Sequence, residues 1–129
     1  MDIGRKKFNE RVSEMLCRMM VTPNLCGFRY IIDSEYYIVK KHCKVNVMYE
    51  IYNSVAEDNK TTAKRVERAI RHLVDGIYDK GNVRLINTLI KVEFYHLVKP
   101  TNNQFLMFLG EMLSREFYVD DDGNIRPIE

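Results

Sequence analysis

Residues 59–81 read NKTTAKRVERAIRHLVDGIYDKG and carry a helix start signal, a helix stop signal and two chemically different faces. Thr61 or Thr62 can cap the N-terminus of this helix, because a threonine hydroxyl accepts a hydrogen bond from an N–H group of the first turn. Gly81 stands where a left-handed residue would end the helix at low steric cost. Apolar residues recur at three- and four-residue spacing: Val66, Ala69, Ile70, Leu73, Val74 and Ile77. The pattern predicts an amphipathic helix with one buried stripe.

The polar face of this predicted helix is basic in its first half and acidic in its second. Residues 60–72 hold five lysines and arginines and a single acid, Glu67, whereas Asp75 and Asp79 follow in the second half. A basic helix face suits the major groove of DNA, which is about 12 Å wide and admits one helix. The same charges also fit an ordinary solvated helix, so charge alone leaves both interpretations open.

The segment before this helix completes a predicted helix-turn-helix motif. Residues 45–58, VNVMYEIYNSVAED, place four apolar or aromatic residues on one helical face: Met48, Ile51, Tyr52 and Val55. A short polar break then leads into the basic helix, so the motif covers about residues 45–80. Such turns often contain glycine; here Asn59 is the candidate for a residue with positive φ.

The rest of the chain predicts further helices. An apolar stripe indicates a first helix that ends at Thr22 and Pro23. In the second helix Gly27 costs about 1 kcal/mol relative to alanine, which indicates close contact with another helix. Residues 82–90 predict a short helix, and residues 91–99 have no helical stripe. Thr101 and Gln104 form a capping box that opens the last helix.

The C-terminal segment, residues 116–129, has a different character. Two short extended pieces flank the turn sequence DDDGN, although a loosely packed acidic tail is the default interpretation. The sequence therefore predicts an all-α protein, a compact bundle of about five or six helices containing the helix-turn-helix. We expect residues 1–115 to form a single domain, followed by an acidic C-terminal tail or short hairpin over residues 116–129.

Length and composition exclude several classes of protein. The 129 residues fit one domain, and a net charge of +2 requires any nucleic-acid footprint to be local. Cys17, Cys26 and Cys43 lack metal-ligand spacing, so we expect buried free thiols. Membrane-spanning runs, signal peptides, phosphate loops and nucleophile elbows are absent from the sequence. We therefore expect a cytoplasmic protein that is not an enzyme and has no cofactor, metal or membrane partner.

Two motifs resemble a known family. TTAKRVERAIRH at residues 61–72 and KPTNNQFLMFLGEML at residues 99–113 resemble the C-terminal DNA-binding effector domain of the master response regulator of sporulation initiation. NLCGFRYI at residues 24–31 resembles the second helix of that family. The resemblance covers roughly residues 12–115. It implies sequence-specific binding of double-stranded DNA and transcriptional regulation.

The resemblance also implies roles for individual residues. Glu67 and Arg68 would face base edges, and chemistry agrees, because arginine can bind guanine O6 and N7 while glutamate accepts from cytosine N4. The predicted base-contacting set is Lys64, Arg65, Glu67, Arg68, Arg71 and His72. The predicted phosphate contacts are Lys60, Thr61, Thr62, Lys99 and Thr101, although capping alone also accounts for the threonine at the start of the last helix. The family generally has a small polar residue in place of Lys64, which leaves the target sequence open.

The family places a phosphoacceptor receiver domain before the effector domain, and about forty residues before the helix-turn-helix are too few for one. The chain is either an excised domain or a stand-alone effector, and its start at Met1 favours the second. A stand-alone form is expected to bind DNA without phosphorylation, as a homodimer on tandem sites. A full-length response regulator or RNA polymerase are further candidate partners. The alternative is a receiver-less interaction protein that dimerises with a full-length regulator and modulates it.

Overall fold

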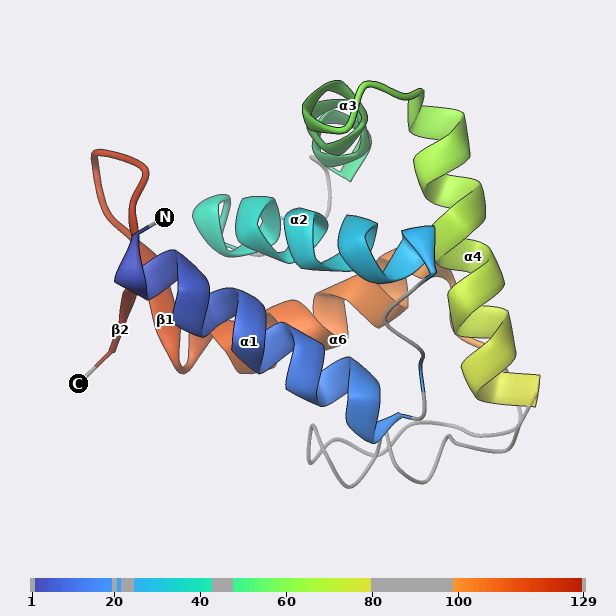
Figure 1. Ribbon diagram of the computed structural model, residues 1–129, viewed down its shortest axis with the longest axis horizontal. Helices are drawn as coiled ribbons and strands as arrows, with labels where there is room; N and C mark the ends of the chain where they lie inside the picture. Colours follow the sequence, from blue (N-terminus) through green and yellow to red (C-terminus); the bar gives the residue numbers. More distant parts are fainter. Residues whose placement is uncertain (1, 20, 22–24, 43–47, 80–98, 129) are drawn as a thin grey trace.

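The computed structural model describes residues 2–19, 21, 25–42, 48–79 and 99–128. Within these ranges the chain forms five helices and one two-stranded antiparallel hairpin (Figure 1). In chain order they are α1 (Ile3–Arg18), α2 (Cys26–Lys40), α3 (Met48–Asp58), α4 (Ala63–Asp79), α6 (Asn102–Ser114), β1 (Phe117–Val119) and β2 (Ile125–Pro127). The all-α class with a short C-terminal hairpin is confirmed. Gly81, the helix predicted at 82–90 and the stretch at 91–98 lie outside the described residues.

Helix α2 lies at the centre of the bundle and contacts α1, α3, α4 and α6 (Figure 1). Its apolar residues are buried among these neighbours: Phe28, Ile31, Ile32, Ile38 and Val39. Gly27 lies where α2 meets α4, because a Cβ atom at this position would stand only 2.6 Å from the carbonyl oxygen of Ala69. Glycine therefore lets the two helix backbones approach closely, as predicted.

Side-chain caps mark the starts of α1 and α6. The Asp2 side chain accepts a hydrogen bond from the Gly4 N–H at the start of α1 (3.3 Å). At the start of α6, the Thr101 hydroxyl accepts from the Gln104 N–H (3.1 Å), and the Gln104 side chain accepts from the Thr101 N–H (2.9 Å). The predicted capping box is confirmed, and it satisfies two N–H groups that the first turn leaves free.

The C-terminal hairpin packs on the helical core, so the default prediction of a loosely packed tail is wrong. Phe117 and Ile125 are buried, and the Phe117 ring meets the Phe8 ring edge-on at 5.3 Å. A Cβ atom at Gly4 would lie 2.0 Å from the Ile125 carbonyl oxygen, so β2 runs directly over the backbone of α1. Phe117 before the acidic turn and Ile125 after it bury apolar surface, and this burial holds the hairpin against the helices. The division of the chain at residue 115 stays a prediction.

The structure describes two of the three cysteines. Cys17 and Cys26 are unpaired, but both are exposed, so the prediction of buried thiols is wrong for these two. Cys43 lies outside the described residues. None of the helices in the described ranges is long and apolar enough to cross a membrane.

Candidate nucleic-acid interface

Helices α3 and α4 occupy the two helical positions of the predicted helix-turn-helix and are joined by a turn of four residues, 59–62. In Figure 1, α3 is seen nearly end-on at the top, and α4 runs down the right side of the molecule. The turn begins with two backbone hydrogen bonds, from the Thr61 N–H to the Ala56 oxygen (2.9 Å) and from the Lys60 N–H to the Glu57 oxygen (3.2 Å). This is the Schellman arrangement, which needs a left-handed residue just after the helix.

The left-handed residue in this turn is Lys60, with φ 54°, so the prediction of Asn59 for this role is wrong. The Asn59 side chain has a different function. Its Nδ2 donates to the Val55 oxygen (2.8 Å) and to Oδ2 of Asp33 in α2 (2.9 Å). Asp33 is only 6% exposed, and Arg29 forms an ion pair with it at 3.3 Å. Asn59 thus fixes the turn to the central helix, at a site that the sequence reasoning missed.

The apolar stripe of α4 faces the core. Val66, Ile70, Leu73, Val74 and Ile77 are buried, and Ala69 lies half-buried against Gly27. Of the two candidate caps, Thr62 begins the helix, because its Oγ1 accepts a hydrogen bond from the Arg65 N–H (3.2 Å). Burial of this stripe fixes the rotation of α4 about its own axis. The opposite face must therefore lie at the surface.

Five of the six predicted base-contacting residues are exposed on that opposite face: Lys64, Arg65, Glu67, Arg68 and His72. The sixth, Arg71, is half-buried, with 35% of its side chain exposed. Within the part of the chain that the structure describes, Lys64, Arg65 and Arg68 form no ion pair. The first half of α4 therefore presents three uncompensated cations to solvent.

Charges in the second half of α4 are paired with one another. Arg71 donates from Nε to Oδ1 of Asp75 (2.8 Å), and its Nη2 lies 2.7 Å from the same oxygen. Lys99 lies 3.1 Å from Asp79 and 3.5 Å from Asp75. The hydrogen bond to Asp79 raises the pKa of the Lys99 amine. We call these four residues the paired cluster; its two cations and two anions sum to zero.

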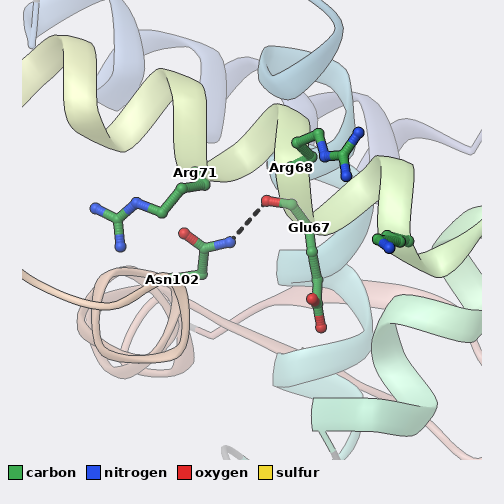
Figure 2. A pocket seen from close by; sticks show the side chains of 5 residues that line it. Glu67, Arg68, Arg71 and Asn102 are labelled. Atoms are coloured by element: carbon green, nitrogen blue, oxygen red, sulfur yellow. Dashed lines mark hydrogen bonds between the residues drawn. The ribbon is translucent and has the colours of Figure 1, made fainter.

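A shallow hollow of about 290 Å³ lies between the first half of α4 and the start of α6, lined by Lys64, Glu67, Arg68, Arg71 and Asn102. Figure 2 shows Arg68 and Arg71 pointing to opposite sides of it. The Asn102 Nδ2 donates to the Glu67 carbonyl oxygen at 2.8 Å (Figure 2). Its Oδ1 is buried and has no hydrogen-bond partner among the described residues. Sequence reasoning missed Asn102, although it directly follows the capping threonine.

The start of α6 also contacts α3. The Tyr52 hydroxyl donates to Oδ1 of Asn103 (2.8 Å), which joins the first helix of the motif to α6. Burial, followed by the negative charge of Glu67, raises the pKa of Tyr52, so its hydroxyl stays protonated and remains a donor. Asn102 and Asn103 together hold α6 against both helices of the helix-turn-helix. The position of the basic face is thereby fixed from two sides.

The predicted phosphate contacts fall into two separate groups. Lys60, Thr61 and Thr62 lie together in the turn before α4, beside the uncompensated cations. Lys99 lies beside Asp79 at the other end of α4, within the paired cluster. Thr101 caps α6 next to Asn102, whose side chain reaches the Glu67 carbonyl oxygen in the first half of α4. At 1.5 Å per residue, the two ends of α4 are about 25 Å apart. The described residues contain no group of three or more metal-ligating side chains that could hold an ion.

The comparison with protein families agrees with this geometry. A family model described as "Sporulation initiation factor Spo0A C terminal" matches residues 12–113, which include α3, α4, the hollow and all of α6 except its last residue. This family comprises DNA-binding effector domains of a transcription regulator and is not a family of enzymes. The chain therefore belongs to the family of the sporulation initiation factor Spo0A C-terminal domain.

Proposed function

We propose that this protein binds double-stranded DNA in a sequence-specific manner, with α4 in the major groove, and regulates transcription in the cytoplasm. The proposal is carried by the exposed, unpaired positive charges on the first half of α4. Lys64, Arg65 and Arg68 are exposed and form no ion pair among the described residues, and they lie on the face of α4 opposite the apolar residues that are buried in the core. The early residues of a recognition helix are the ones that reach base edges in this motif.

Roles follow from the chemistry of each side chain. Arg68 offers a planar fork of donors that matches the O6 and N7 acceptors of guanine, and Glu67 can accept from the cytosine amino group. Lys64, Arg65 and His72 lie around this pair and are proposed to contact neighbouring bases. Arg71 is also proposed to read a base, but it must first leave Asp75.

Phosphate contacts are proposed from the turn. Lys60 supplies a charge, and the Thr62 hydroxyl, which accepts from the Arg65 N–H, still has its own proton to donate to a phosphate oxygen. Thr61, the residue between them, is also proposed to contact a phosphate. Lys99, beside the far end of α4, and Thr101, at the cap of α6, are proposed to contact other phosphates. Contacts of this kind position the protein and carry no sequence information directly.

Selection of bound duplexes from a random-sequence pool tests the proposal. The purified chain is expected to enrich one short box, and its affinity for that box is expected to exceed its affinity for a scrambled duplex at the same salt concentration. A duplex with two boxes in tandem shows whether two copies bind cooperatively, which is the proposed homodimer. A pool with no enriched box would contradict the proposal, and binding only to a full-length response regulator would support the interaction protein instead.

A further inference from the structure

The second half of α4 holds two cations that are paired, in contrast to those of the first half. Arg71 is among the residues proposed to read bases, yet its Nε donates to Oδ1 of Asp75, and its Nη2 lies 2.7 Å from the same oxygen without forming a hydrogen bond. Lys99 has two carboxylates within 3.5 Å, those of Asp75 and Asp79. The arginine is therefore neutralised locally while Arg68, one turn earlier, is not.

The strength of the Arg71–Asp75 pair determines what can displace it. Both side chains are about one third exposed, at 35% and 37%, and the buried Nη2 of Arg71 forms no hydrogen bond among the described residues, so the pair is held by a single hydrogen bond from Nε and is partly screened by solvent. An arginine placed before an acid at i,i+4 is also the less favourable orientation on a helix. Such a pair is weaker than a two-pronged contact between arginine and guanine. A single solvated phosphate contact is a screened ion pair of the same kind and offers Arg71 no gain over Asp75.

We propose that Asp75 is a specificity-determining residue that withholds Arg71 from phosphates and releases it to a matching base. This inference rests on the proposed function, because it concerns the choice between DNA sequences. On DNA of the wrong sequence, Arg71 stays with Asp75 and contributes no phosphate contact. On the matching box, the stronger contact to a base edge replaces the carboxylate.

Removal of the carboxylate is expected to strengthen non-specific binding. In the variant Asp75→Asn, Arg71 is free to bind a phosphate on any sequence. Lys99 keeps Asp79 at 3.1 Å, so the change acts mainly through the arginine. Each additional phosphate contact makes the slope of log K against log salt more negative by about 0.9. Affinity for the matching box should rise less, so discrimination between duplexes should fall.

Fluorescence anisotropy titrations over a range of salt concentrations test this inference. Two labelled duplexes of about two helical turns are compared, one with the selected box and one of mixed sequence. Asp75→Asn is expected to steepen the mixed-sequence slope by about 0.9, and Asp75→Ala should do the same as a second variant. In an Arg71→Met background the same substitution should leave the slope unchanged, because no guanidinium is released.

Asp121→Asn is the charge-matched control. It removes one carboxylate from the exposed hairpin turn, which lies at the opposite end of the molecule from α4 (Figure 1), and it should leave the slope unchanged. The inference is overturned if Asp75→Asn leaves the mixed-sequence slope unchanged, or if it steepens the slope equally in the Arg71→Met background. Failure of the unaltered protein to bind either duplex would instead overturn the proposed function.

Discussion

Helices α2 and α4 pack closely against each other but carry their charged residues in opposite ways. Helix α4 fully buries only apolar side chains, and its charged residues are exposed or, for Arg71 and Asp75, half-buried. Helix α2 buries three polar residues in succession: Asp33, Ser34 and Glu35. The first arrangement leaves a surface that can bind a ligand. The second arrangement fixes the turn between α3 and α4 to the central helix, and burial of its polar groups reduces the stability of the folded state.

The three buried polar residues of α2 differ in how well they are satisfied. Asp33 binds Asn59 and Arg29, and the Ser34 hydroxyl donates to the Tyr30 carbonyl oxygen (2.7 Å). Glu35 is 0% exposed, and neither of its carboxylate oxygens has a hydrogen-bond partner among the described residues. Only Glu35 therefore represents an uncompensated cost, because a buried polar group without a partner destabilises the folded state.

The largest expected effect comes from replacing Glu35. Burial raises the pKa of its carboxyl group well above the usual 4.5. The folded state therefore holds a proton that the unfolded state loses, so this group's contribution is fully present below about pH 4.5 and is lost as the pH rises. Glu35→Met should stabilise the protein by about 1–3 kcal/mol at acidic pH, and the gain should grow towards neutral pH. Urea unfolding at several pH values measures it.

Glu35→Gln is the matched control for this prediction. It keeps the shape and a buried polar group but cannot ionise. Its free energy of unfolding should therefore lose the pH dependence that Glu35 gives the unaltered protein, while staying below that of Glu35→Met. An unchanged pH dependence in the glutamine variant would show that Glu35 does not remain protonated in the folded state.

A second prediction concerns the exposed side of α4. Arg68→Ala should cost about 1–3 kcal/mol on the selected box and relax the preference at one base pair. The free energy of unfolding should change by no more than about 0.5 kcal/mol, because the side chain is exposed.

Lys60→Ala should weaken binding to all duplexes alike and reduce the salt slope by about one unit. Identical behaviour of the two variants would contradict the proposed division between base and phosphate contacts.

The smallest expected effect concerns the turn. Lys60 has φ 54°, a left-handed conformation that costs a residue with a Cβ atom about 1 kcal/mol relative to glycine. Lys60→Gly should therefore stabilise the fold by about 1 kcal/mol although it removes the charge, whereas Lys60→Ala should leave stability nearly unchanged. Equal stabilities of the two variants in urea unfolding would mean that the turn carries no such strain.

Features of α4 and α6 could be predicted from the sequence because their signals are local. The buried stripe of α4 follows from residue spacing, and the Thr101–Gln104 capping box needs only four consecutive residues. The close approach at Gly27 could also be predicted, since a glycine inside an apolar helix is typical of a place where two helix backbones come into contact.

Features that join distant parts of the chain could not be predicted. The hydrogen bond between Asp33 and Asn59 and the one between Asn102 and the Glu67 carbonyl oxygen depend on how the helices pack. The buried Glu35 reads as an ordinary polar residue of an amphipathic helix. The packing of Ile125 over Gly4 links the two ends of the chain, so no local pattern reveals it. The Arg71–Asp75 pair is an exception, because its i,i+4 spacing could have been read directly.

The proposal that the first half of α4 reads the duplex is tested most directly by two double variants that each remove two cations. Arg65→Ala with Arg68→Ala changes the proposed reading face, whereas Lys6→Ala with Lys7→Ala removes two exposed charges from α1. On the selected box, the first is expected to lower affinity by about tenfold or more for each arginine that contacts a base. The lysine variant should retain preference for the box over a scrambled duplex. Equal losses in both variants, or an unchanged preference without the arginines, would contradict the proposal.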